Sequence, residues 1–351
     1  MILYVGNYLT KHGYTPTFNE ILSLKLKESY TVRRSSDRLN QAARLFSMVY
    51  SVFRYRKKAE IVLIDSYSTR AFWFLVCSSI AARICRVPYV TILRGGYMEN
   101  RLKRNPRLCK MVFGKSFSNI SPSLHMLKIF TEHGFEVKYI PNHLELEKYS
   151  YQRRKKIRLK LFYLRSLHKI YNPLMAVDIL KKLVDKYGDA ELCMVGPDKD
   201  GSRQEMEDRA DELGVRNKIK FTGRLDKPGW RKLSQDYDIF INTTNVDNHP
   251  VSVIEAMALG LVVVSTNAGG MPFLIESGQE GYLVRPQDPD AFIEKISLLY
   301  EHPELAVVLT DNARKKVEDF DWLLVKENFF EIIKNATGQL PGQFEPEEAG
   351  F

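Results

Sequence analysis

Short β-rich apolar runs alternate with longer helical patterns from one end of this 351-residue chain to the other. That alternation is typical of βαβ units, whose strands form parallel sheets covered by helices. Two such series are visible, and a chain of this length holds about two domains. The sequence therefore predicts an α/β fold with two doubly wound parallel sheets, and it excludes a disordered, collagen-like or disulfide-stapled chain.

The same alternation gives the expected boundaries. In the first series we expect strands at 1–5, 30–33, 60–64, 89–93, 116–120 and 137–140, and helices near 17–26, 39–55, 69–85 and 124–132. In the second we expect strands at 160–163, 190–195, 219–221, 239–243, 262–266 and 281–284, and helices near 173–187, 204–213, 230–235, 251–259, 272–276 and 290–300. We place an N-terminal domain at 1–145, a basic linker at 146–159, a C-terminal domain with a closing C-terminal helix at 160–336, and a flexible tail at 337–351.

Charge is divided unevenly along the chain. Residues 1–160 carry 30 Lys and Arg against 10 Asp and Glu, whereas residues 161–351 carry 22 against 32. A basic surface attracts nucleic acid, anionic lipid headgroups or phosphorylated substrates, although each dense basic run can also be a plain solvated surface. Nucleic acid is disfavoured as a partner, because no strand combines basic residues with interleaved aromatic ones. Peripheral contact with an anionic membrane stays open.

Targeting and redox signals are sparse. The N-terminus has no basic leader, and no apolar run reaches the roughly 18 residues that a spanning helix needs, so we expect a cytoplasmic protein, at the inner face of the membrane if it is peripheral. We interpret Trp73, with Phe72 and Phe74, as part of a buried helix face rather than a membrane wedge. The four cysteines form no CxxC pair, so we expect reduced thiols without a structural zinc or disulfide.

The loop after the expected strand 239–243 is the most informative one, because ligands of open α/β sheets bind beyond the carboxyl ends of the strands. Asn248 is a good N-cap residue, and Pro250 suits the first turn of a helix. Free N–H groups at such a helix start favour a phosphate. Glu255, further along the helix, suits neutral hydroxyls such as a ribose diol. The expected phosphate-binding segment consists of Asn248, His249, Pro250, Val251 and Ser252.

This segment resembles a known family. Asp247, the following Asn-His-Pro, Glu255 and the run at 261–272 (LVVVSTNAGGMP) resemble the Glu, seven residues, Glu motif and its continuation in retaining nucleotide-sugar glycosyltransferases of the GT-B fold, family 4. The resemblance covers roughly residues 160–330 and is weaker over the first 150 residues.

The resemblance implies two Rossmann-like domains that face each other across a cleft, with the nucleotide-sugar donor held mainly by the second and a glycan or lipid-linked acceptor by the first. It implies that Glu255 binds the donor ribose and that Asp247, at the first Glu position, lies near the sugar hydroxyls and the reacting carbon. The implied activity is hexosyl transfer in surface polysaccharide synthesis, with no cofactor.

Arg165 and Lys169 follow the first strand of the second domain, where two cations would clamp a diphosphate. They resemble the Arg and Lys with which the family stabilises the leaving nucleotide diphosphate, although their spacing is one residue shorter here. Negative charge grows on that group as the glycosyl bond breaks, and preorganised donors contribute most where charge grows. With two side-chain cations in this place, we expect no bound metal.

Other candidates are spread over both halves. Gly6 and Asn7 end the first strand, where family members often carry a glycine-rich loop. Gly196, Phe221 and Thr244 belong to strand ends of the second half and are expected to shape the donor site. Arg94 follows the fourth strand where relatives commonly show His, and as a catalytic residue it would bind a phosphate or carboxylate.

Two other functions stay open. One is a nucleotide-sugar 2-epimerase on the same fold, which also releases the nucleotide diphosphate. The other is a catalytically inactive sugar- or nucleotide-binding relative, which Arg94 and Asp247 suggest. The run Asp236-Tyr237-Asp238 matches the metal signature of another glycosyltransferase fold, but it precedes a parallel strand, opposite the ligand-binding end. We interpret it as a helix-to-strand turn.

Overall fold

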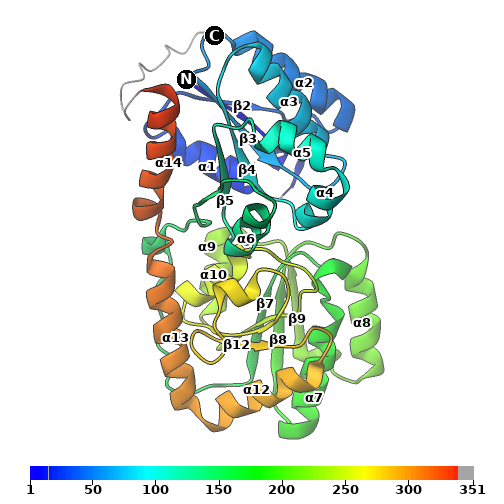
Figure 1. The fold of residues 1–351 in the computed structure, drawn as a ribbon. Coiled ribbons are helices and arrows are strands. Elements are labelled where there is room, and N and C mark those ends of the chain that lie inside the picture. Colours follow the sequence, from blue (N-terminus) through cyan, green and yellow to red (C-terminus); the bar gives the residue numbers. More distant parts are fainter. Residues whose placement is uncertain (15, 339–351) are drawn as a thin grey trace. The chain divides into compact units, whose positions relative to one another are not determined.

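The computed structural model describes residues 1–14 and 16–338, which fold into two compact units (Figure 1). Unit 1 comprises Met1–Asn142 and the described residues from Leu323 onwards, and unit 2 comprises His143–Trp322. Each unit is built on one six-stranded parallel sheet with flanking helices. The predicted pair of doubly wound parallel sheets is therefore confirmed.

The sheet of unit 1 has the strand order β2-β1-β3-β4-β5-β6. Its strands are β1 (Ile2–Val5), β2 (Val32–Ser35), β3 (Ile61–Ser66), β4 (Tyr89–Leu93), β5 (Ser118–Ser121) and β6 (Lys138–Tyr139). Its helices are α1 (Phe18–Leu26), α2 (Gln41–Tyr55), α3 (Phe72–Ile84), α4 (Met98–Arg104), α5 (Pro106–Phe113) and α6 (Leu124–Glu132), with a 3₁₀ turn at Thr10–His12.

The sheet of unit 2 has the order β12-β11-β10-β7-β8-β9. Its strands are β7 (Lys160–Leu164), β8 (Glu191–Val195), β9 (Ile219–Gly223), β10 (Ile239–Asn242), β11 (Val262–Thr266) and β12 (Tyr282–Val284). Its helices are α7 (Leu174–Tyr187), α8 (Ser202–Glu212), α9 (Lys227–Ser234), α10 (Val251–Ala258), α11 (Met271–Leu274), α12 (Pro289–Glu301) and α13 (Pro303–Glu318), with 3₁₀ turns at Leu146–Lys148, Lys169–Tyr171 and Arg216–Lys218. Helix α14 (Trp322–Thr337) begins in unit 2 and continues in unit 1.

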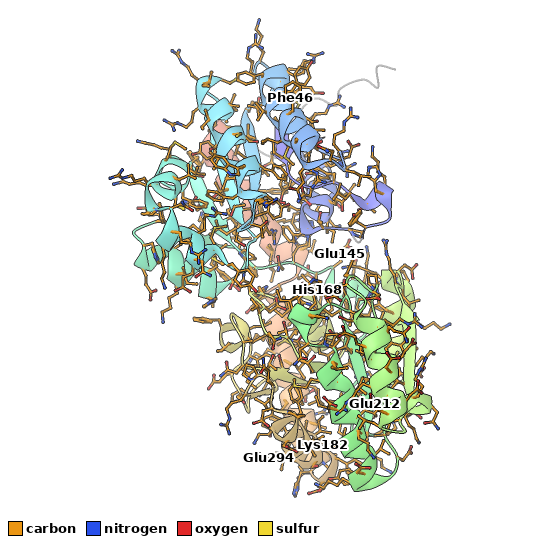
Figure 2. All side chains as sticks on the ribbon, turned by 90° about the vertical axis from the view of Figure 1, so that its right-hand side faces the viewer. Phe46, Glu145, His168, Lys182, Glu212 and Glu294 are labelled. Atoms are coloured by element: carbon orange, nitrogen blue, oxygen red, sulfur yellow. The ribbon has the colours of Figure 1, made fainter. Side chains whose placement is uncertain are left out.

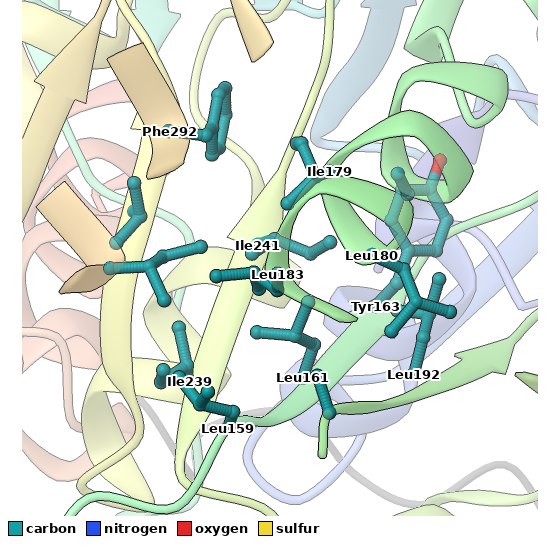
Figure 3. Close-up of a cluster of buried hydrophobic side chains, with 14 of the residues drawn as sticks. Leu159, Leu161, Tyr163, Ile179, Leu180, Leu183, Leu192, Ile239, Ile241 and Phe292 are labelled. Atoms are coloured by element: carbon teal, nitrogen blue, oxygen red, sulfur yellow. The ribbon is translucent and has the colours of Figure 1, made fainter. Parts of the chain in front are cut away.

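Both faces of the unit 2 sheet are covered, and the apolar residues of its central strands are buried on both faces. Leu161 and Ile239 point to one face with Phe292 of α12 (Figure 3), and Phe162 and Phe240 belong to the cluster on the other face. This packing fixes the carboxyl ends of β7 and β10 as neighbours, since these strands pair in parallel register.

The structure adds two helices, α4 and α5, in a basic stretch to which the sequence pattern assigns no element. Leu102, Cys109 and Val112 are buried, whereas Arg104 and Lys110 are exposed. Each helix has only seven or eight residues, so its apolar stripe is too short to stand out as a period in the sequence.

Two boundaries differ from the expected ones. Helix α14, placed by the sequence in the 160–336 domain, contributes its residues from Leu323 onwards to unit 1, where Phe330 packs edge-on against Tyr30 with ring centres 5.3 Å apart and Glu331 pairs with Lys138 at 2.9 Å. The expected linker 146–159 belongs to unit 2 and buries Tyr149 there. Residues 339–351, most of the expected tail, lie outside the described residues.

The chain enters and leaves unit 2 at one place. The backbone of Leu144 donates to Phe320 O at 2.9 Å and accepts from the Trp322 N–H at 2.7 Å. The His143 ring lies 4.6 Å from the Trp322 ring. The first and last segments of unit 2 are therefore bonded to each other side by side.

A buried ion cluster lies under β10, at the amino end of the strand. Asp238 is 2% exposed and accepts hydrogen bonds from Arg154 Nε at 3.2 Å and from Arg158 Nε at 2.8 Å. Arg154, itself 4% exposed, also donates to carbonyl oxygens of Tyr237, Leu259 and Gly260. The interpretation of Asp238 as part of a helix-to-strand turn is confirmed, and its charge is used structurally. Within residues 1–14 and 16–338, no group of carboxylate, His and Cys side chains is arranged to hold a metal ion.

In the same described part of the chain, none of the helices combines the length and the apolar character that crossing a bilayer requires.

Candidate active site

A buried ion pair joins the loops after β7 and β10. Arg165 directly follows β7, and its Nη2 lies 2.6 Å from Oδ2 of Asp247. The two side chains are only 17% and 9% exposed. The Arg165 guanidinium carbon also lies 4.1 Å from the centre of the Tyr171 ring, a cation–π contact. The structure thus brings together two residues that the sequence separates by 82 positions.

The charges of this pair depend on each other. Burial raises the pKa of the Asp247 carboxyl, while Arg165 and the backbone N–H of Asn248 favour its ionised form. Burial works against the Arg165 cation too, but Asp247 and Tyr171 outweigh it and hold the pKa of Arg165 above its usual value. Arg165 is therefore a fixed positive charge in a partly desolvated site, where electrostatic interactions are strong.

Backbone packing places Asp247. Gly270 donates its N–H to Asp247 O at 2.7 Å. A Cβ on Gly270 would lie 1.7 Å from Asn248 O, and one on Gly269 would lie 2.0 Å from Asp247 O. Only two residues without side chains allow the loop after β11 to press this closely on the loop after β10. The Gly-Gly pair is therefore a positioning device for Asp247.

Gly196 positions Arg165 by the same kind of close backbone approach. It follows β8, and a Cβ there would lie 1.9 Å from Arg165 O. The Arg165 N–H donates to Val195 O at 3.0 Å. The predicted site residue Gly196 thus supports the backbone from which the guanidinium projects.

Helix α10 begins at Val251, where the sequence pattern places it, but its cap is a different residue. It runs from Val251 to Ala258 with Pro250 at the N-cap position, so the expectation that Asn248 caps it is wrong. Asn248 instead continues the loop, and its N–H bonds to Asp247 Oδ1 at 2.9 Å. Val251 and Ser252 open the helix, and the buried Ser252 hydroxyl has no hydrogen-bond partner among the described residues. His249 packs against Phe320 with ring centres 5.6 Å apart.

Glu255 lies on α10 and is 5% exposed. Its Oε1 accepts hydrogen bonds from the Tyr149 hydroxyl at 2.7 Å and from Lys227 Nζ at 2.9 Å. Burial, followed by the nearby Glu255 charge, raises the pKa of Tyr149 far above its usual range. Tyr149 therefore stays a hydroxyl donor at every accessible pH, and it fixes the orientation of the carboxylate.

Lys169 is not brought to the Arg165–Asp247 pair. It opens the 3₁₀ turn after β7, its Nζ pairs with Glu205 of α8 at 2.6 Å, and its side chain is 65% exposed. Its N–H donates to Asp200 at 2.9 Å. The Arg-Lys clamp is not assembled in this structure, and the role of Lys169 stays a prediction.

Two other predicted site residues, Thr244 and Phe221, mainly stabilise the structure around them. Thr244 is fully buried, its hydroxyl bonds to Val246 O at 2.9 Å and its carbonyl accepts from Thr266 at 2.5 Å. Phe221 lies on the edge strand β9, with the guanidinium groups of Arg203 and Arg216 within 5.4 Å of its ring centre. Thr244 thus shapes the loop that carries Asp247, and Phe221 is held at the sheet edge.

Unit 1 has its own polar cluster at the carboxyl ends of its strands. A Cβ on Gly6 would lie 2.1 Å from Asn19 Nδ2 and 2.9 Å from Asp65 Oδ2. Asn7 accepts from the buried Arg44 at 2.9 Å. Arg94 follows β4, stacks at 3.5 Å over the Phe18 ring and donates from Nη1 to Asn142 at 2.8 Å. Gly6, Asn7 and Arg94 are thus grouped in one unit, and their part in a donor or acceptor site stays a prediction.

Asp65 is the titratable centre of that cluster. It is 3% exposed and accepts hydrogen bonds from the hydroxyls of Tyr4 and Tyr67, each at 3.1 Å. Burial raises the pKa of Asp65 to about 6, although Arg94 and the two hydroxyls favour its charged form. Protonation at mildly acidic pH is therefore coupled to the folding of unit 1.

The free energy of unfolding is expected to fall as the pH rises from about 4, the pKa of an unfolded Asp, to about 6. In this window the folded chain binds more protons than the unfolded one. The stabilisation that comes from protonated Asp65 is therefore fully present below the window and is lost as the pH rises through it. The Asp65 contribution is about 3 kcal/mol in order of magnitude. Urea unfolding of the wild type and Asp65→Asn at pH 4, 5, 6 and 7 measures it. The difference between the two proteins should grow with pH, and parallel curves would contradict the assignment.

The sequence pattern assigns no role to four residues of these clusters, Tyr149, Lys227, Tyr171 and Asp65. Tyr149 lies in the expected linker, whose many charged residues give no sign that its side chain is buried. Asp65 lies at the carboxyl end of the third strand, so the rule for parallel sheets applies to it. For Lys227, at the start of α9, and Tyr171, in a 3₁₀ turn, the sequence carries no signal beyond proximity to a strand end.

Comparison with known proteins gives one family match. Residues 148–316 match the family model described as glycosyl transferases group 1. A sulfoquinovosyl transferase from Arabidopsis thaliana is 31% identical over 153 residues, which are 42% of this chain and 28% of that protein. This chain thus spans well under half the length of that relative.

Solved structures match nearly the whole chain. Anabaena HepE in complex with UDP has a TM-score of 0.74 at 17% identity, covering 95% of this chain and 99% of that chain. Sucrose-phosphate synthase from Thermosynechococcus elongatus has a TM-score of 0.76 at 14% identity, covering 95% and 98%. At these identities the likeness shows the fold, which is the GT-B fold. The predicted fold class is confirmed, while the facing of the two domains across a cleft stays a prediction.

Proposed function

We propose, from the premise that residues 148–316 are a glycosyl transferases group 1 domain, that this chain is a retaining glycosyltransferase. It moves a hexose from a nucleotide-sugar donor to a glycan or lipid-linked acceptor in surface polysaccharide synthesis, at the inner face of a membrane. The observation that carries the proposal is the buried pair of Arg165 and Asp247, joined at 2.6 Å ahead of the start of α10.

The pair has the charges that glycosyl transfer requires. When the bond between sugar and phosphate breaks, negative charge develops on the diphosphate and positive charge on the sugar ring. In the proposed mechanism the Arg165 guanidinium and the N–H groups of Val251 and Ser252 stabilise the diphosphate, while the Asp247 carboxylate stabilises the positive sugar. These donors are fixed before the reaction, which makes their stabilisation effective.

Glu255 is proposed to accept hydrogen bonds from the donor ribose. Its carboxylate is held by Tyr149 and Lys227, so a diol meets an already oriented acceptor. The Lys227 charge partly offsets that of Glu255, which lowers the repulsion between Glu255 and the diphosphate. The HepE structure in complex with UDP supports a nucleotide ligand on this fold. Because the Arg165 guanidinium and the helix N–H groups serve the diphosphate, the proposed reaction uses no metal and no cofactor.

Glu255→Ala is expected to lower turnover at least about tenfold, because the ribose loses a charged hydrogen-bond acceptor. The assay is donor hydrolysis over a panel of UDP-, GDP- and ADP-sugars, followed by transfer to candidate acceptors. Glu212→Ala and Glu294→Ala are matched controls, since both carboxylates project from the surface of unit 2 (Figure 2). Unchanged rates in Glu255→Ala would remove the assigned site. Conversion of a donor to its 2-epimer would establish the epimerase instead, and failure to bind any nucleotide would exclude both enzymes.

A further inference from the structure

We propose that the solvent-facing sides of α2 and α3 in unit 1 dock onto an anionic lipid bilayer. The surface consists of Phe46, Tyr50, Trp73, Ile80 and Ile84, with a basic border at residues 54–58 and 83–86. We call it the α2–α3 face. It adds a membrane-binding surface to the proposed function and is testable without donor or acceptor.

The apolar part of the α2–α3 face is unusually exposed. Phe46 is 75% exposed, Tyr50 56%, Trp73 52% and Ile84 67%. Phe46 projects from unit 1 (Figure 2) and stacks on Tyr50 with ring centres 6.5 Å apart. The expectation that Trp73 is buried with its neighbours is wrong, because only Phe72 and Phe74 turn inward. Large apolar side chains gathered in this way mark an interaction site.

Helical spacing puts the exposed and partly exposed apolar residues of α3 on one stripe. Trp73, Cys77, Ile80 and Ile84 follow each other at intervals of four, three and four, while Phe72, Leu75, Val76 and Ser79 are buried. Helix α3 is thus apolar on both sides, although one side faces the core and the other faces solvent. On α2 the buried positions are Arg44, Met48 and Val52, so Phe46 and Tyr50 turn away from the core.

The border of the face carries one sign of charge. Residues 54–58 and 83–86 contain six Lys or Arg and neither Asp nor Glu. Arg54, Arg56, Lys57 and Lys58 are exposed at the end of α2, and Arg83 and Arg86 at the end of α3. Because β2 and β3 both run parallel to β1, the helices that follow them run in one direction. Figure 1 shows α2 and α3 side by side, so their basic ends lie at one edge of the unit.

This combination fits a lipid surface better than a protein partner. Trp and Tyr rings are favoured at the boundary between headgroups and acyl chains. Basic side chains beside them attract anionic headgroups, and long aliphatic stems reach the interface. Helices that present apolar and basic side chains together in this way lie in the plane of a membrane without crossing it. An acidic protein would satisfy the charges but would not require the exposed Phe46 ring.

The test uses the full chain and vesicles of phosphatidylcholine, with or without one quarter phosphatidylglycerol. Of the three Trp residues, Trp230 and Trp322 are buried, so Trp73 gives the red-shifted emission. We expect co-sedimentation and a blue shift of that emission with anionic vesicles at low salt, and weaker binding at high salt. The double variant Phe46→Ser, Ile84→Ser is expected to weaken binding about tenfold or more.

Val308→Ser is the matched control, because Val308 is 57% exposed on α13 of unit 2, and it should bind as the wild type does. Replacing Arg54, Arg56, Lys57 and Lys58 by Gln should remove most of the salt dependence. No binding to anionic vesicles at low salt would overturn the proposal, as would binding that the double variant leaves unchanged. A stable dimer that shields Trp73 from a water-soluble quencher without vesicles would assign the face to a second copy. Donor hydrolysis is measured separately, so the failure of either proposal leaves the other standing.

Discussion

Replacing Arg165 by Ala is expected to lower turnover of the nucleotide-sugar donor about 100-fold or more, the usual cost of removing one preorganised donor from a developing anion. The guanidinium is the fixed charge next to Asp247, so its loss also removes the group that favours the ionised carboxylate. The acid limb of the pH–rate profile should therefore move to higher pH, since Asp247 protonates more readily without Arg165.

Steady-state kinetics across pH 5 to 9 measure both effects, and Arg203→Ala is the matched control. Arg203 lies on α8 with a partly exposed guanidinium that contacts Phe221 and Glu207. Thermal unfolding shows whether the variant stays folded, and a double-mutant cycle with Asp247→Asn separates shared from independent effects. A folded Arg165→Ala variant with wild-type turnover would refute the mechanism, and a large rate loss without a pH shift would remove the proposed dependence of Asp247 on Arg165.

Replacing Asp238 by Ala is expected to destabilise unit 2 by about 3–5 kcal/mol, the usual cost of breaking a buried ion pair from one side. Arg154 is 4% exposed and would keep its charge among carbonyl oxygens without the carboxylate. Arg158, half exposed, can turn to water instead. The loss therefore comes mainly from Arg154.

Urea unfolding followed by the fluorescence of Trp230 and Trp322, both buried in unit 2, measures the change as a lower midpoint. Asp236→Ala is the control, because that neighbouring carboxylate is exposed and its removal should cost almost nothing. An equal midpoint for Asp238→Ala and the wild type would show that the cluster contributes no net stability. It would also reopen the interpretation of the Asp-x-Asp run.

The sheets could be predicted because runs such as 89–93 and 262–266 are short and rich in apolar and β-branched residues, and the structure places strands at the same residues. Arg165 and Asp247 could each be predicted as site residues, since both follow parallel strands. Their ion pair could not, because it depends on β7 and β10 being neighbours in the sheet. The burial of Tyr149 and Arg154 could not be predicted, because it depends on long-range packing under α10 and β10. A charged sequence without a period does not reveal such packing. The exposed side of α3 could not either, since a helix that is apolar all round gives no sign of which side faces the core.

The paired ends of unit 2 have a consequence for the architecture. The backbone of Leu144 bonds to both Phe320 and Trp322. Residues 143–322 are therefore an insertion in the chain of unit 1 whose two ends lie together. Joining ends that already touch requires little closure entropy. Unit 2 can therefore be excised, or circularly permuted, at the one place where its first and last segments meet.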